Sequence, residues 1–236
     1  MRLQGSIIVE VTRWCNLECQ HCLRGDRQRK KQTYQNMYEF LGNFSYVDTV
    51  TFTGGEHTLA PDIIGLFIDA SRHLGVNIGN YYIATNAEKI TQKFLKVWER
   101  LHHWCDDNDI SGVDISNDQF HCGNQDQHKL FDFAEMYDLP CRFKYEKWKP
   151  DYGQCISEGR AENWSSKIVE KTPFRYNIWD EDVFAYSEGE LYLNCKGNII
   201  HGCDWSFESQ DKPENIIAHV KDFKPEMLIE LGELDT

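Results

Sequence analysis

The sequence has no long apolar run and little positive charge for its length. Its 236 residues include 25 Lys and Arg against 38 Asp and Glu, a formal net charge of −13. A membrane-spanning helix needs about 18 or more apolar residues in succession, and no stretch approaches that length. The apolar run at Ser6–Glu10 is too short for a secretory signal. We therefore expect a soluble cytoplasmic protein whose acidic surface repels nucleic acid and does not engage a membrane.

One segment is an exception to the acidic composition. Its basic residues are Arg24, Arg27, Arg29, Lys30 and Lys31. Such a run is usually a solvated loop. The alternative is a contact patch for an anionic substrate or an electron donor.

The nine cysteines cannot form a complete set of disulfides, because their number is odd. Cys15, Cys19 and Cys22 lie close together, and clustered thiols in a reducing compartment usually bind a metal. The remaining six are scattered: Cys105, Cys122, Cys141, Cys155, Cys195 and Cys203.

Strand-like and helix-like segments alternate through the first part of the chain, at intervals of roughly 30 to 40 residues. The predicted strands are 7–12, 49–53, 81–84, 112–116 and 141–145. The predicted helices are 63–74, 94–101 and 130–137. This alternation predicts an α/β fold with a mostly parallel sheet, and right-handed crossovers should curl it into a partial (β/α)6-type TIM barrel.

The alternation ends near residue 150. Residues 153–175 lack periodicity and are expected to be irregular, whereas residues 190–200 predict a β-hairpin with Gly197 at its turn. Helical segments are expected at 216–220 and 227–234. We thus expect a core over residues 1–150 and an extension over 151–236 that completes or caps the barrel.

The three clustered cysteines share one short loop after the first predicted strand. A [4Fe–4S] cube has four irons, so three local thiolates leave one iron open to a ligand that is not protein. The alternative is structural zinc, completed by His21 or a distant cysteine. Structural zinc prefers four ligands, usually as two separated pairs, so the spacing favours the iron–sulfur cluster.

The Cys-x3-Cys-x2-Cys spacing of Cys15, Cys19 and Cys22 resembles the radical S-adenosylmethionine (radical SAM) superfamily, and the resemblance covers roughly residues 6–150. It implies that these cysteines hold a [4Fe–4S] cluster whose open iron is chelated by S-adenosylmethionine. Reduction then cleaves the sulfonium to a 5′-deoxyadenosyl radical that abstracts hydrogen from a substrate. The resemblance also implies oxygen sensitivity and an electron donor of flavodoxin or ferredoxin type.

Further motifs resemble the family's cofactor-binding segments, and the resemblance assigns their roles. Gly54-Gly55-Glu56 is similar to its Gly-Gly-Glu motif, whose carboxylate pairs with the cofactor ammonium. Proline often follows that motif in the family, where this chain has His57. The cofactor-binding residues implied in this way are His21, Gly54, Gly55, Glu56, Asn86, Ser116, Asp118 and Arg160.

These segments follow successive predicted strands, and parallel barrels assemble their active sites at that edge. Asn86, Ser116 and Asp118 alone would also fit turns or caps. Arg160, in a Gly-Arg-Ala segment similar to one in some members, would hold a carboxylate of cofactor or substrate. A plain surface arginine is the alternative.

Cys195 and Cys203 flank a hairpin that resembles the start of auxiliary-cluster domains, but no clustered cysteines follow. Buried reduced thiols are therefore favoured. The alternatives are a second cluster that includes Cys155, or a reactive thiol activated by His201 or Asp204.

The sequence identifies no catalytic side chain beyond the cofactor site. The hairpin resemblance favours a peptide or amino-acid-like substrate over another small metabolite. Two other classes stay open: an iron–sulfur electron-transfer protein without catalysis and a zinc-stabilised interaction module. An activase of a glycyl-radical enzyme would be a subclass of the radical SAM enzymes. A ferredoxin would normally close its cluster with a fourth local cysteine.

Overall fold

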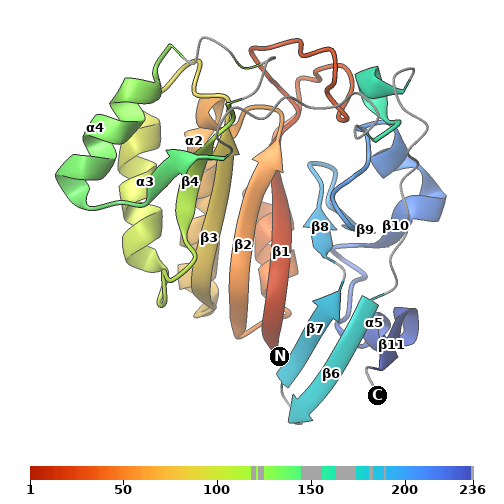
Figure 1. The fold of residues 1–236 in the computed structure, drawn as a ribbon. Helices are drawn as coiled ribbons and strands as arrows, with labels where there is room; N and C mark the ends of the chain where they lie inside the picture. The colour runs from red at the N-terminus through yellow and green to blue at the C-terminus, as the bar shows by residue number, and fades with distance from the viewer. Residues whose placement is uncertain are drawn as a thin grey trace.

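The computed structural model describes residues 1–117, 121, 125–144, 156–162, 174–180, 183–188 and 190–234. Its centre is an open sheet in the order β10-β9-β8-β1-β2-β3-β4-β5 (Figure 1). The parallel strands are β1 (Arg2–Thr12), β2 (Tyr46–Gly54), β3 (Asn77–Thr85), β4 (Gly112–Ile115) and β5 (Cys141–Phe143). The predicted α/β class and partial-barrel topology are confirmed.

Four helices follow the parallel strands. They are α1 (Tyr34–Leu41), α2 (Pro61–Leu74), α3 (Gln92–Trp104) and α4 (Gln127–Tyr137). Thr33 and Thr91 cap α1 and α3 by accepting from the amides of Asn36 and Phe94. Gly75, in the left-handed conformation at φ +68°, ends α2. Helix α1 was not predicted from the sequence.

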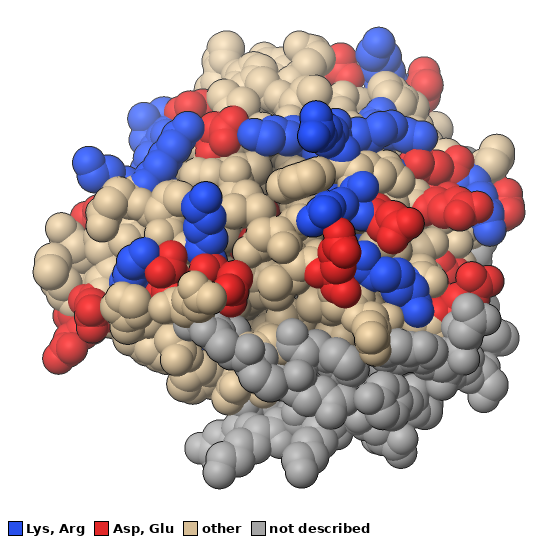
Figure 2. All heavy atoms as spheres, turned by 90° about the horizontal axis from the view of Figure 1, so that it is seen from above, with Lys and Arg blue, Asp and Glu red and all other residues tan. Residues whose placement is uncertain are grey.

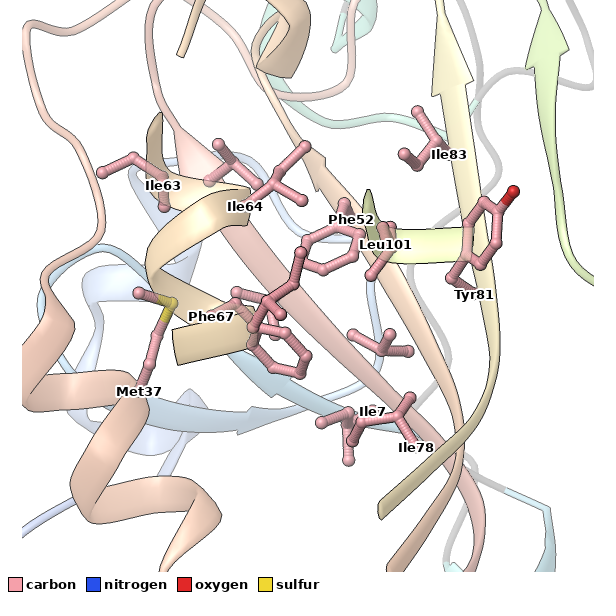
Figure 3. Close-up of a cluster of buried hydrophobic side chains, with 14 of the residues drawn as sticks. Ile7, Met37, Phe52, Ile63, Ile64, Phe67, Ile78, Tyr81, Ile83 and Leu101 are labelled. Carbon is pink, nitrogen blue, oxygen red and sulfur yellow. The ribbon is translucent and has the colours of Figure 1, made fainter. Parts of the chain in front are cut away.

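The main core lies between the sheet and the helices. Phe52 of β2 and Phe67 of α2 pack edge to face with ring centroids 5.2 Å apart (Figure 3). Along β1, Ile7 and Val9 belong to this core, whereas Ile8 packs with Tyr192 and Ile200 in a second, smaller cluster. The alternation of a strand therefore gives β1 one face toward the helices and one toward the barrel interior.

The C-terminal part adds strands to the other edge of β1. The predicted hairpin is confirmed: β8 (Leu191–Leu193) pairs with β9 (Asn198–His201), and Gly197 at the turn has φ +81°. β8 also pairs in parallel with β1. A second antiparallel pair, β6 (Phe174–Asp180) and β7 (Val183–Glu188), was not expected from the sequence.

The helix expected at 216–220 is wrong. Residues Ile216–His219 form β10, antiparallel to β9, because β-branched residues next to an open sheet edge gain ladder hydrogen bonds. The last predicted helix is shorter than expected, since α5 (Glu226–Leu231) is followed by β11 (Gly232–Leu234). Within the described ranges, no helix is long and apolar enough to span a membrane.

Candidate active site

A pocket of about 300 Å³ opens where β1 to β4 end, at the top of Figure 1. Each predicted site residue that the structure describes lines it. Asp118 lies outside the described residues. The predicted residues gathered there are Cys15, Cys19, His21, Cys22, Gly54, Gly55, Glu56, Asn86, Ser116 and Arg160.

The cysteine loop is held by its own turns and by a distant segment. The amide of Cys22 donates to the carbonyl of Cys19 at 3.2 Å, and the Leu17 amide donates to Cys15 Sγ at 3.4 Å. Arg160 reaches the loop from far along the chain. Its Nε donates to the Cys19 carbonyl at 2.9 Å and its amide to the Cys22 carbonyl at 3.0 Å. Arg160 therefore fixes two of the three cysteines through their backbone.

The Cys15 thiol is affected both by burial and by the charges around it. Burial, together with the charges of Glu56, Cys22 and Cys19, raises the pKa of the Cys15 thiol to about 12. Thiolates are soft donors, and a cationic metal centre would displace the proton of Cys15 on binding it. In the described part of the chain, no three ligand-type side chains lie close enough to hold one single ion. A four-iron cluster places each thiolate on a different iron, so the donor set fits that group.

Gly54 and Gly55 have a structural reason to be glycine. A Cβ on Gly54, whose φ is +125°, would lie 2.2 Å from the Thr12 carbonyl oxygen. A Cβ on Gly55 would lie 2.3 Å from the Trp14 carbonyl oxygen. The Gly55 amide donates to the Thr12 carbonyl at 2.6 Å. The glycines thus let the end of β2 press against the segment that leads into the cysteine loop.

Glu56 joins the ends of β2 and β3 beside the pocket. Its carboxylate is 2% exposed, and Oε1 accepts from the Thr58 amide and hydroxyl and from the Thr85 hydroxyl. Oε2 accepts from the Asn86 amide at 3.0 Å. A carboxylate has about four acceptor positions, two on each oxygen, so Oε2 keeps capacity for one more donor.

The neighbour of Glu56 in sequence is an unusual histidine. His57 is 1% exposed, and neither ring nitrogen has a hydrogen-bond partner among the described residues. Burial lowers the pKa of His57, which keeps the imidazole neutral. It does not line the pocket.

Gly159 makes the contact between Arg160 and the loop possible. It lies in a 3-10 turn, Gly159–Ala161, with φ +59°. A Cβ there would lie 2.4 Å from the Gly25 nitrogen and the Leu23 carbonyl oxygen. The Gly-Arg-Ala segment therefore lies directly against the cysteine loop, a relationship that the sequence spacing alone did not show.

A C-terminal segment, residues 205–211, crosses the loop and is called the strap here. Arg13, which is fully buried, donates to both carboxylate oxygens of Asp211 at 2.9 and 3.1 Å. The Phe207 amide donates to the Arg24 carbonyl, and Arg24 Nη1 donates to the Trp205 carbonyl. The strap thus holds the loop on both sides. The strap was not predicted from the sequence, because no local pattern signals a contact across so many residues.

Glu10 lies under the strap and completes this buried network. It accepts from Arg13 Nε at 3.0 Å and from the Cys195 amide at 2.6 Å. Burial raises the pKa of Glu10, and the charge of Arg13 opposes that shift. A buried carboxylate beside a buried guanidinium ties the end of β1 to the turn of the β8–β9 hairpin.

His121 also belongs to the site and was not predicted from the sequence. Its Nε2 lies 3.6 Å from Cys19 Sγ, and its ring meets that of His21 edge to face at 5.5 Å. It lines the pocket beside the cysteines. A lone histidine after β4 carries no sequence signal that would single it out.

The C-terminal cysteines do not line the pocket. Cys195 is 8% exposed, its Sγ donates to the Glu10 carbonyl at 3.4 Å, and burial raises its pKa. Cys203 is half-buried, and burial together with Glu190 and Asp204 raises its pKa to about 12. Neither is an activated thiol at neutral pH. Cys155 lies outside the described residues.

Comparisons with known proteins give a consistent result. Residues 9–118 match the family model of the radical SAM superfamily. A solved structure, native anSMEcpe with bound AdoMet and Cp18Cys peptide, aligns over 98% of this chain and 80% of its own, with a TM-score of 0.58 and 12% identity. That likeness shows the fold.

Two further relatives match over less of their length. Streptococcus suis SuiB bound to precursor peptide SuiA aligns over 65% of this chain and 35% of its own, with a TM-score of 0.46 and 17% identity. An uncharacterized protein of Methanocaldococcus jannaschii, MJ0907, is 33% identical over 100 residues, which are 40% of this chain and 35% of that protein. The chain thus matches about a third of that relative.

Proposed function

Since this chain belongs, through residues 9–118, to the radical SAM superfamily of enzymes, we propose that it cleaves S-adenosylmethionine reductively at a [4Fe–4S] cluster held by Cys15, Cys19 and Cys22. The observation that carries this proposal is the shared pocket: the three thiols, Glu56, Asn86 and Ser116 line one cavity at the strand ends. When bound, the cluster and S-adenosylmethionine would supply a 5′-deoxyadenosyl radical that abstracts hydrogen from the substrate.

The side chains around the thiols would bind and orient the cofactor. Glu56 Oε2, with one acceptor position left, suits the ammonium group of S-adenosylmethionine. Asn86 and Ser116 offer an amide and a hydroxyl for its carboxylate and ribose. His21 offers a ring for the adenine. Arg160 would keep the loop in place through the Cys19 carbonyl, and from the pocket lining it would also hold a carboxylate of cofactor or substrate.

We propose a peptide or amino-acid-like substrate. The anSMEcpe structure, which shares this fold, is described with a bound peptide. A second polar cavity of about 360 Å³ adjoins the cofactor pocket and shares Arg24 and Arg160 with it. Its serines, glutamates and Lys212 offer both donors and acceptors, as a peptide backbone requires. A small polar metabolite is the alternative that direct assay separates.

The test is anaerobic reconstitution with iron and sulfide. We expect 5′-deoxyadenosine, measured by mass spectrometry, after dithionite and S-adenosylmethionine are added, and none with Cys15→Ala. A full cluster without 5′-deoxyadenosine, even with candidate peptides present, would indicate an electron-transfer protein. Zinc in place of iron would indicate a structural metal site.

Such a cluster is oxygen-sensitive, which fits a reducing cytoplasm and a flavodoxin- or ferredoxin-type donor.

A further inference from the structure

Of the basic cluster of the sequence, Arg24 and Arg27 line the cofactor pocket, whereas Arg29, Lys30 and Lys31 do not. The exposed members of the cluster are Arg27, Arg29, Lys30 and Lys31, called the basic patch here. We propose that the basic patch is the docking surface of a small acidic redox protein that delivers the electron to the cluster. The proposal rests on the proposed function, because it assumes a cluster on the cysteine loop.

Positive charge is distributed unevenly along the chain. Residues 23–31 hold five of the chain's 25 Lys and Arg but only one acidic residue, in a chain with a net charge of −13. Figure 2, which looks down on the face where the strands end, shows Lys and Arg side chains in a row across it. An acidic partner is repelled by most of this protein, so such a patch selects where it lands.

Part of the positive charge of the basic patch is not neutralised by ion pairs among the described residues. Arg27 pairs with Glu18 at 2.7 Å, and Lys31 lies 3.8 Å from Asp62. Arg29 and Lys30 have no ion-pair partner in the part of the chain that the structure describes. Two exposed cations are therefore left to meet acidic groups on another molecule.

The basic patch is attached directly to the segment that leads into the cysteine loop. The Arg13 amide donates to the Lys30 carbonyl, and the Gln28 amide donates to the Arg13 carbonyl, both at 2.9 Å. The guanidinium groups of Arg27 and Arg29 lie 4.9 and 5.7 Å from the ring centre of Trp14, the residue before Cys15. A protein on the patch therefore sits beside the cluster ligands.

The size of the patch favours a redox protein over nucleic acid. Electron-transfer encounters are weak and small, and electrostatic steering sets their rate. Nucleic acid needs many phosphate contacts to bind, and here its backbone would extend over an acidic surface. In the transfer, the donor loses one electron and the cluster gains one, and no bond is made or broken.

The test compares two double charge reversals of the reconstituted protein. Arg29→Glu/Lys30→Glu alters the patch, and Lys93→Glu/Lys96→Glu alters two exposed lysines of α3 with the same change in charge. The probe is an acidic flavodoxin, with binding measured by biolayer interferometry at low and high salt. We expect about a tenfold loss of affinity for the patch variant, less than about twofold for the control, and weaker wild-type binding in salt.

A second readout is the rate of cluster bleaching by fully reduced flavodoxin, which should fall in parallel with affinity. Photoreduced 5-deazariboflavin, a small reductant, should bleach all three proteins equally. Equal affinity of both variants for flavodoxin would overturn the proposal, as would patch-dependent binding of single-stranded RNA without binding of flavodoxin. A failure of the proposed function would be seen separately, as a missing cluster or no 5′-deoxyadenosine with dithionite.

Discussion

Arg13 and Asp211 lie 198 residues apart in the sequence, yet their side chains form a two-point ion pair across the cysteine loop. Arg13 is fully buried, and Asp211 Oδ2 also forms an ion pair with Lys196 Nζ at 2.8 Å. A guanidinium that meets a carboxylate with two parallel bonds has a fixed geometry, so the pair sets the position of the strap.

Asp211→Asn should therefore destabilise the fold. The change leaves the buried guanidinium of Arg13 with Glu10 as its remaining anionic partner, and we expect a loss of about 2–3 kcal/mol in urea unfolding. Asp222→Asn, at an exposed position, is the control and should change stability by less than about 0.5 kcal/mol. Equal stability of the two variants would contradict the role given to the pair.

The Arg13–Asp211 pair also predicts that the folding stability of the protein depends on pH. Burial acts to raise the pKa of Asp211, but hydrogen bonds and charges from Arg13 and Lys196 outweigh it, and the pKa is lowered. A carboxyl with a lowered pKa contributes its stability above the unfolded value, about 3.9, and loses it as pH falls further. The difference between wild type and Asp211→Asn should thus shrink below about pH 4.

Gly159→Ala should damage the cysteine loop without touching a cysteine. The new methyl group would lie 2.4 Å from backbone atoms of Leu23 and Gly25. Iron bound after reconstitution should fall by more than about half. Gly75→Ala is the matched control, since its φ is also positive at +68° but nothing lies within 4 Å of the added carbon. It should cost about 1 kcal/mol of stability and keep full iron content. Equal iron in both variants would refute the contact.

Glu56→Gln should weaken cofactor binding and leave the cluster intact. The amide cannot neutralise an ammonium, and its NH2 would face donors such as the Asn86 amide. We expect at least a tenfold rise in the dissociation constant for S-adenosylmethionine by calorimetry. Thr85→Val removes one hydrogen bond to Glu56 but keeps its charge, so it separates a structural effect from an electrostatic one. Unchanged affinity of Glu56→Gln would remove this carboxylate from the cofactor site.

His57→Leu should stabilise the protein, because two buried ring nitrogens that have no partner among the described residues are replaced by an apolar group of similar size. The expected gain is about 1–2 kcal/mol. Burial lowers the pKa of His57, so the unfolded chain binds more protons and wild-type stability falls as pH drops below about 6.5. Urea unfolding at pH 7.5 and 5.5 should show this loss in wild type and less of it in His57→Leu. The exposed His128→Leu serves as control.

Cys195→Ala should leave the iron content unchanged and cost about 1 kcal/mol of stability. Its thiol is buried against the Glu10 carbonyl and stays protonated, so it is a poor ligand. Iron analysis of the reconstituted variant checks this. A fall of about half would restore the hypothesis of a second cluster.

The sequence predicted the alternation of strands and helices and the mostly parallel sheet, because each strand and its helix form a local unit. For the same reason it brought the cysteines, Glu56 and Asn86 to one edge: residues that follow parallel strands meet there. Ile216–His219 was mistaken for a helix because its apolar spacing suits either structure, and pairing with β9 decides between them. Arg13, Gly159 and the strap escaped prediction because their partners are distant in sequence.

The sequence separation between Arg13 and the strap also determines when their contact can form during translation. Arg13 and the three thiols leave the ribosome early, but Asp211 follows only after 198 further residues have been added. Until then the loop has its contacts with Arg160 but lacks this ion pair, which contacts of low sequence separation cannot supply. The placement of the strap against the cysteine loop is therefore completed only after residue 211 has been translated.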